Sequence, residues 1–238
     1  MQSPPRLPGV EPHKSNFVGD TPLVECTKVA PNDDLNSLRN RNYDRYMVDT
    51  KQTKTIGEHY VAAELARRGW APAFTRDGLE RTDILAVKVD GAPRRMIEIQ
   101  VKAARGPRFE RISWPLGLKS QTPAIQEGEH FVLVAIPTAV GEAPRCFVVP
   151  RDHLAAAAWI AHEDWRTDPA AKPGTRNAGV DRSRVSLQVL ERYEGCWYLL
   201  DADQSAAPVL LPGAFRSLAA DPRVGLPPGH PWKHALPE

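Results

Sequence analysis

Apolar residues alternate with polar ones in two neighbouring stretches, residues 82–88 and 96–102, which flank the pair Asp90-Gly91. Such alternation is typical of β-strands with one buried face, and an Asp-Gly pair between two strands is typical of a tight turn. The pattern therefore predicts two adjacent antiparallel strands joined by a short loop.

The second strand of this hairpin is expected to carry one strongly polar face. Because side chains alternate across a strand, the apolar residues at positions 97, 99 and 101 share one face. The other face carries Glu98, Gln100 and Lys102. Asp83 directly precedes the apolar run of the first strand. An acid, an amide and an amine are therefore expected to meet at one end of the hairpin.

Hydrophobic periodicity predicts further elements on both sides of the hairpin. A helix is expected at residues 55–68, ended by Gly69, and a short strand near residues 73–75. The continuous apolar run at residues 130–137 predicts a central strand covered on both faces. Together with the segments after it, this order predicts an α/β sandwich with a mixed sheet. Those segments are a strand at 145–149, a helix at 153–164 capped by Asp152 with Leu154, Ala157, Ala158 and Ala161 on its apolar side, a polar loop at 164–184, and short β segments at 185–190 and 196–200.

Proline-rich segments at both ends suggest the domain organisation. The chain has 238 residues, enough for one core with appendages. Residues 1–50 are expected to form an extended arm, residues 51–203 one domain, and residues 204–238 a tail with little structure of its own.

Basic residues are concentrated in one region of a nearly neutral chain. The formal net charge is +2, but residues 88–119 hold eight lysines or arginines against three acids. Such a local excess suits a phosphate backbone, although a solvated basic loop explains it equally well. The candidate phosphate contacts are Arg94, Arg95, Arg105, Arg108, Arg111 and Lys119.

Several other classes of protein are disfavoured by the sequence. No stretch approaches the roughly 20 apolar residues of a membrane span, and the proline-rich start lacks a signal-peptide pattern. The three cysteines form no CxxC pair, and the histidines lack zinc-like spacing. A protein of the reducing cytoplasm is expected.

The predicted helix at residues 55–68 carries an acid on its apolar side. At 100° per residue, Glu58 falls on the same face as Val61, Ala62 and Leu65. Glu64, Arg67 and Arg68 are expected elsewhere on the helix. A carboxylate that points toward a core needs a partner. The alternative is that Glu58 lies near the helix start and favours the helix dipole.

Three short motifs together resemble the PD-(D/E)XK nuclease superfamily. They are Gly57-Glu58-x-x-Val61-Ala62 on the helix, Asp83-Ile84 on the first strand, and Ile99-Gln100-Val101-Lys102 on the second. The order and spacing are most similar to the Holliday-junction-resolvase and restriction-endonuclease-like branches, in a variant with QxK in place of ExK. The resemblance covers about residues 55–149. It implies a three-layer sandwich with a central mixed β-sheet flanked by helices.

The resemblance also implies a role for each motif residue. Asp83, the amide oxygen of Gln100 and the backbone carbonyl of Val101 would hold Mg²⁺, with Mn²⁺ as a substitute. Lys102 would orient or deprotonate the attacking water, and Glu58 would hold a metal-bound water or a second metal. Gln100 brings no negative charge, and Glu98 is expected to compensate through a water molecule.

The expected function is that of a metal-dependent DNA endonuclease. Roles in restriction, phage defence or repair all fit, and a homodimer would cut two strands most simply. Two alternatives stay open: a catalytically silent nucleic-acid-binding module of the same fold, and a protein-interaction scaffold that uses the proline-rich ends. In a third interpretation, Glu98, Lys102 and Asp83 form only a surface ladder of weak ion pairs.

Overall fold

The computed structural model of the chain describes residues 49–75 and 79–237. The arm expected at residues 1–50 therefore falls outside the described residues, apart from its last two positions. Within the two described ranges, no helix combines the length and the apolar character that are needed to cross a bilayer.

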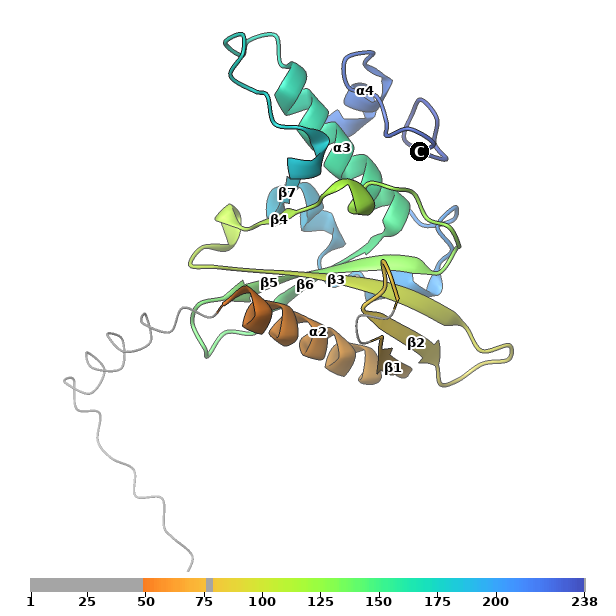
Figure 1. Cartoon of the computed structure of the whole chain (residues 1–238). Helices are drawn as coiled ribbons and strands as arrows, with labels where there is room; N and C mark the ends of the chain where they lie inside the picture. Colours follow the sequence, from red (N-terminus) through yellow and green to blue (C-terminus); the bar gives the residue numbers. More distant parts are fainter. Residues whose placement is uncertain (1–48, 76–78, 238) are drawn as a thin grey trace, which may run out of the picture. The chain divides into compact units, whose positions relative to one another are not determined.

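The described chain is an α/β structure built on a five-stranded mixed sheet (Figure 1). Strands β3 and β5 are parallel, and the other neighbouring strands of this sheet are antiparallel. The strands, in their order across the sheet, are β1 (Trp70–Phe74), β2 (Ile84–Lys88), β3 (Met96–Gly106), β5 (Glu129–Pro137) and β6 (Arg145–Pro150). A smaller sheet pairs β4 (Ser113–Pro115) with β7 (Arg184–Ser186). The helices are α2 (Thr50–Ala66), α3 (Arg151–Thr167) and α4 (Ala214–Ala220), with 3-10 turns at Phe109–Arg111, Leu118–Ser120, Val180–Arg182, Leu187–Tyr193 and Trp197–Asp201.

The hairpin predicted from the alternating pattern is confirmed as β2 and β3. Ile84 lies opposite Ile99, and Leu85 lies opposite Glu98. The isoleucines at positions 97 and 99 are almost completely buried. Burial of one face sets the register, because a shift by one residue would turn these side chains out to water.

Helix α2 begins five residues before the predicted start. The side chain of Asp49 accepts a hydrogen bond from the Gln52 backbone N–H at 2.7 Å, and the Gln52 side chain accepts one from the Asp49 N–H. This capping box satisfies backbone donors at the start of the helix. The helix rests closely on β3, since a Cβ atom at Gly57 would lie only 2.6 Å from the Cβ of Ala103.

The expectation that Glu64 lies away from the packed face of this helix is wrong. Glu64 is buried, and its carboxylate forms ion pairs with Arg67 at 2.7 Å and Arg68 at 2.6 Å. The packed face recurs at positions 57, 61 and 64, a spacing of three or four residues. The arginines that follow make burial of the acid tolerable, because they provide its hydrogen-bonding partners.

Strand β5 is the central strand that the apolar run predicted. All of its residues are buried, with α2 on one face of the sheet and α3, β4 and β7 on the other (Figure 1). The small sheet contributes Trp114, whose buried indole N–H donates to the Val134 carbonyl at 3.2 Å. The predicted strand at residues 145–149 is present as β6.

Helix α3 is more buried than predicted, and Asp152 does not cap it. The helix begins directly after Pro150, while one oxygen of Asp152 accepts from the Ala124 backbone N–H at 2.7 Å. All eight residues from Arg151 to Ala158 are buried, so the helix has no single apolar side over its first two turns.

The expectation of a weakly structured tail at residues 204–238 is also wrong. This segment contains α4 and covers α3 with apolar side chains such as Leu211 and Phe215. The indole of Trp159 donates to the Val224 carbonyl at 2.9 Å, and His230 contacts the Asp152 carbonyl at 2.9 Å. Residues 204–237 therefore pack on the same core as the sheet.

The β segments expected at residues 185–190 and 196–200 are only partly present. Strand β7 is limited to Arg184–Ser186, and the following residues form a 3-10 helix, Leu187–Tyr193. Residues 197–201 form another 3-10 helix. Apart from an isolated bridge between Phe147 and Glu194, the described chain offers these segments no strand with which to pair.

Candidate active site

Strand β3 extends beyond its neighbour β2 and leaves part of one edge open. The pairing with β2 covers residues 96–99, whereas the pairing with β5 on the other edge continues to Gly106. Backbone groups of β3 after Ile99 therefore face a gap in the sheet. The motif Gln100-Val101-Lys102 lies at the beginning of this gap.

Asp83 is fixed at the open edge by two hydrogen bonds. Its backbone N–H donates to the Ile99 carbonyl at 2.9 Å, and its carboxylate accepts from the Val101 N–H at 2.8 Å. Because the N–H and C=O of one strand residue point to the same edge, the Val101 carbonyl faces the same gap as Asp83. One carboxylate oxygen and one carbonyl are thus held side by side.

Glu58 approaches this edge from helix α2. The ammonium group of Lys54 lies between the two acids, 3.4 Å from a Glu58 oxygen and 3.8 Å from an Asp83 oxygen. Burial raises the pKa of Glu58, the charge of Lys54 opposes this rise, and the nearby charge of Asp83 adds to it. A hollow of about 440 Å³ opens beside the three residues, with Thr55, His59 and Thr75 in its wall. Two carboxylates thus share one cation in a solvent-accessible hollow. Glu58 lies in the third turn of α2, so the alternative that it stabilises the helix start does not hold.

Lys102 lies on the opposite face of β3 from helix α2. The helix packs on Val101 and Ala103, and alternation turns the Lys102 side chain to the other face. Burial lowers the pKa of the Lys102 amine, with smaller effects from the cations Lys54 and Arg151, while the negative charge of Asp83 raises it. The amine therefore releases its proton more readily than an exposed lysine does.

Gln100 is bound to an arginine, which was not expected for a metal ligand. Its amide oxygen accepts a hydrogen bond from Arg151 at 3.0 Å. Arg151 is almost completely buried and pairs with Glu129 at 2.7 Å, and Arg81 pairs with the same Glu129 oxygen at 3.0 Å. This network holds the Gln100 oxygen on the side of helix α3. A metal role would require the side chain to leave Arg151.

Glu98 is likewise engaged in structural hydrogen bonds. One carboxylate oxygen accepts from the Thr82 hydroxyl, and the other accepts from the Gln126 amide. The first contact joins the two strands of the hairpin, and the second joins the hairpin to the segment before β5. The expected compensation of Gln100 by Glu98 therefore finds no support in the geometry, because both oxygens already have partners.

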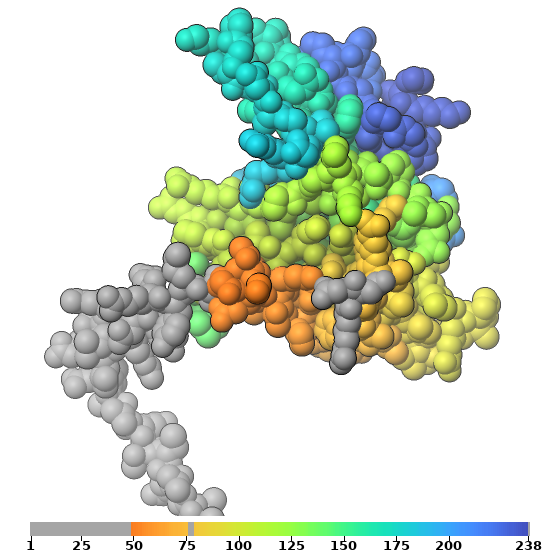
Figure 2. Space-filling view, viewed as in Figure 1, coloured from red at the N-terminus to blue at the C-terminus, as the bar shows by residue number. Residues whose placement is uncertain are grey.

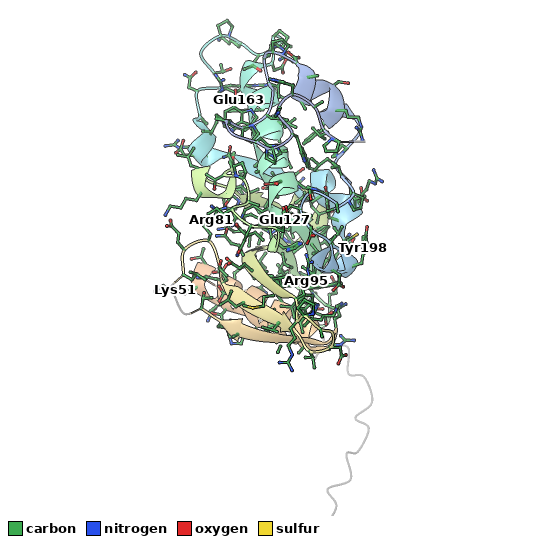
Figure 3. The ribbon with its side chains drawn as sticks, turned by 90° about the vertical axis from the view of Figure 1, so that its right-hand side faces the viewer. Lys51, Arg81, Arg95, Glu127, Glu163 and Tyr198 are labelled. Atoms are coloured by element: carbon green, nitrogen blue, oxygen red, sulfur yellow. The ribbon has the colours of Figure 1, made fainter. Side chains whose placement is uncertain are left out.

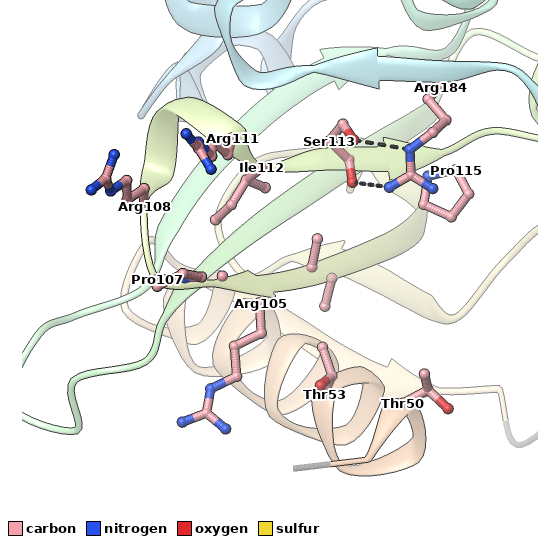
Figure 4. Close-up of a pocket in the computed structure, with 13 residues that line it drawn as sticks. Thr50, Thr53, Arg105, Pro107, Arg108, Arg111, Ile112, Ser113, Pro115 and Arg184 are labelled. Carbon is pink, nitrogen blue, oxygen red and sulfur yellow. Dashed lines mark hydrogen bonds between the residues drawn. The ribbon is translucent and has the colours of Figure 1, made fainter. Parts of the chain in front are cut away.

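A basic groove continues from the site along the open edge of β3 (Figure 4). Its volume is about 530 Å³, and its wall is formed by the end of β3, the start of α2, and the segment that leads into β4. Three predicted phosphate contacts, Arg105, Arg108 and Arg111, line it, and none of them forms an ion pair with another described residue. Arg184 from β7 also lines the groove and was not predicted.

The other predicted phosphate contacts lie outside this groove. Arg95 binds the carbonyls of Leu200 and Ala202 and pairs with Asp203, so it has a structural task. In Figure 3, Arg95 lies toward the right of the lower part of the view, whereas Lys51, which lines the hollow beside Glu58, lies at its left edge. Arg94 is exposed beside Arg95. Lys119 forms an exposed ion pair with Glu80. The basic cluster of the sequence is thus divided between two ends of β3.

The arrangement fits one hard cation with few protein ligands. Mg²⁺ is commonly held by one or two carboxylates together with waters and substrate phosphates, and Asp83 and Glu58 provide such a pair. In the described ranges, no group of three or more histidine, cysteine or acidic side chains is placed to hold a metal. The Lys54 ammonium marks a position between both acids where positive charge is stabilised.

Two residues of the site, Lys54 and Arg151, were not predicted from the sequence. Lys54 lies one helical turn before Glu58, and an (i, i+4) pair of opposite charges is a local signal that could have identified it. Arg151 follows a strand and lies 51 positions from Gln100, so no local pattern predicts their contact. Comparison of the chain with known protein families, with curated proteins and with solved structures finds no match.

Proposed function

We propose that the protein is a metal-dependent nuclease that hydrolyses phosphodiester bonds in DNA. One observation supports this function above the others: Asp83, Glu58 and the Val101 carbonyl border the same gap in the sheet, next to a lysine with a lowered pKa. An arginine-lined groove leads away from this point and suits a polyanionic substrate. The finer fold assignment, a restriction-endonuclease-like three-layer sandwich of the PD-(D/E)XK type, belongs to this proposal.

In this proposal each side chain has a defined task. Asp83, Glu58 and the Val101 carbonyl would hold Mg²⁺, or Mn²⁺ in its place. The ion would polarise the phosphoryl oxygen and lower the pKa of a bound water. The Lys102 amine, whose pKa is lowered by burial, would take a proton from the attacking water as the new P–O bond forms. The bond to the leaving oxygen would break at the same time, and that oxygen would take its proton from solvent water. The arginines of the groove bind the neighbouring phosphates and fix the scissile bond.

The proposal is tested by nicking of supercoiled and branched DNA in Mg²⁺, Mn²⁺ or EDTA. We expect cleavage that requires metal and that Asp83→Asn and Lys102→Met each reduce by at least about a hundredfold, the usual range for general acid–base groups. Asp90→Asn, in the exposed hairpin turn, and Lys172→Met, in an exposed loop, are matched controls that should keep full activity. Equal activity of Asp83→Asn and the Asp90→Asn control would refute the assignment.

A catalytically silent DNA-binding module is the second candidate. It is favoured by the hydrogen bond that holds Gln100 on Arg151 and by the Lys54 ammonium between the two acids. A silent module would bind DNA with a steep salt dependence and cut none of the substrates. Gln100→Glu separates the two candidates further, since a gain of cleavage in this variant alone would show that the missing carboxylate is what silences the site.

Partners and biological setting are also proposals. A homodimer would place two such sites on the two strands of a duplex, and sedimentation with and without DNA tests this arrangement. Cleavage of foreign DNA in restriction or phage defence, or of branched DNA in repair, would take place in the cytoplasm. Activity on methylated, unmethylated and branched substrates distinguishes these roles.

A further inference from the structure

A half-exposed tryptophan lies near the C-terminal end of helix α3. Trp165 exposes 41% of its surface, which is unusual for such a large apolar side chain. Its ring packs against His162, with ring centroids 5.6 Å apart, and the guanidinium of Arg176 lies 5.7 Å from the ring centroid. A hollow of about 270 Å³ opens beside the ring and is lined in addition by Ala178, Arg182 and Arg184.

Arg184 joins this hollow to the basic groove at the candidate active site. It lines both. Its guanidinium donates to the carbonyl and the hydroxyl of Ser113 at 2.8 and 2.9 Å, which fixes the side chain across the small sheet (Figure 4). Figure 2 shows the segment at residues 105–112, in yellow-green, and the segment at residues 168–184, in teal, bordering the same hollowed side of the molecule. The two hollows therefore lie on either side of Arg184, and together they are called the track below.

The charge along this track is positive. Arg182 and Arg184, like the three arginines of the groove, form no ion pair within the described ranges. Near Trp165, Asp168 pairs with Arg176 at 3.0 Å, Glu163 pairs with Arg166, and Asp164 lies 3.7 Å from Arg223. Asp181 and Glu110 form no ion pair within the described ranges, but the five arginines outnumber them. A polyanion is thus attracted along the whole track, and an apolar ring is presented at its end.

We propose that a single-stranded segment of nucleic acid binds along this track, with its backbone on the arginines and a base stacked on Trp165. Duplex bases stack on one another and offer no free face, whereas an unpaired base can stack on an aromatic ring beside cationic groups. The inference rests on the proposed function and refines its substrate: the preferred DNA carries a single-stranded stretch next to the cleaved bond.

The test measures binding in EDTA, so that no cleavage is needed. Fluorescence anisotropy compares an oligothymidine of about 20 nucleotides with a duplex of the same length. We expect Trp165→Ala to weaken single-strand binding about tenfold, the typical effect of losing one base–aromatic stack, and to change duplex binding less than about twofold. Trp165→Phe should recover most of the loss. Tyr198→Ala, which removes a different exposed aromatic ring, is the matched control and should change neither affinity.

The outcomes separate this inference from the nuclease proposal. Unchanged single-strand binding by Trp165→Ala, or an equal loss on both substrates, would overturn the stacking site whatever the enzyme does. A wild type that binds neither substrate would overturn it as well. Selective loss of single-strand binding in a protein that cuts no DNA with any metal would support the track and refute the nuclease. Circular dichroism of each variant verifies its fold.

Discussion

Replacing Gly57 with alanine measures how closely helix α2 packs on strand β3. A Cβ atom at this position lies 2.6 Å from the Ala103 Cβ, about 1 Å closer than carbon atoms normally pack. An additional methyl group in a well-packed interface costs about 1–3 kcal/mol, while alanine gains about 0.5–1 kcal/mol over glycine inside a helix. We expect the variant to lose about 1 kcal/mol of unfolding free energy.

The double variant Gly57→Ala with Ala103→Gly isolates the contact. It removes the clash, so the two substitutions should couple favourably by about 2 kcal/mol. Urea denaturation of the wild type, both single variants and the double variant gives this coupling, provided that the m-values agree. Since Glu58 moves together with Gly57, DNA cleavage should fall in Gly57→Ala and recover in the double variant. A coupling below about 0.5 kcal/mol would mean that α2 does not rest on β3 in this register.

Three further predictions follow from the electrostatics. Lys102→Met should raise the free energy of unfolding at neutral pH, because burial disfavours the charged amine of the wild type. This gain in stability should shrink as the pH rises toward the ordinary lysine pKa of 10.5. Urea titrations at several pH values can measure it. Burial lowers the pKa of His130 to about 4 and of His153 to about 3. Below pH 6.5 these two histidines therefore bind protons in the unfolded chain but not in the folded chain. Each of these two histidines should therefore cost about 2 kcal/mol of stability between pH 6.5 and 5, and His153→Phe should remove its own share of about 2 kcal/mol; an unchanged dependence would contradict the burial of His153. Arg111→Ala should reduce the slope of log affinity for DNA against log salt by about 1, whereas Arg94→Ala, at the other end of β3, should leave it unchanged.

The parts of the fold that could be predicted are those with a local signal. The hairpin follows from alternation within a few residues, and β5 follows from a continuous apolar run. The 3-10 helix at residues 197–201 has the aromatic and branched residues of a strand but finds no strand to pair with among residues 49–75 and 79–237, and the presence of such a partner depends on the whole fold. The C-terminal segment is rich in proline, yet its dispersed apolar residues cover α3, which only the assembled core reveals.

The candidate site, like the fold, was predictable only where the sequence carries a local signal. The resemblance implied that Asp83 and the Val101 carbonyl act together, and the Val101 N–H donates a hydrogen bond to the Asp83 carboxylate. Gln100 was expected to act beside them, but a buried arginine 51 positions later engages its oxygen. Residue type and strand position place a side chain on a face, whereas its hydrogen-bonding partner depends on chain segments that no local pattern connects.

The packing of residues 204–237 on α3 has a consequence for synthesis. Trp159 bonds to Val224, and the Asp152 carbonyl bonds to His230, so the helix stays partly uncovered until residues 224–230 have emerged from the ribosome. At about 5–20 residues per second, the apolar residues of α3 remain exposed for several seconds after they emerge. During that interval the nascent chain exposes apolar side chains of α3, and chaperones in the cell should bind mainly to this helix.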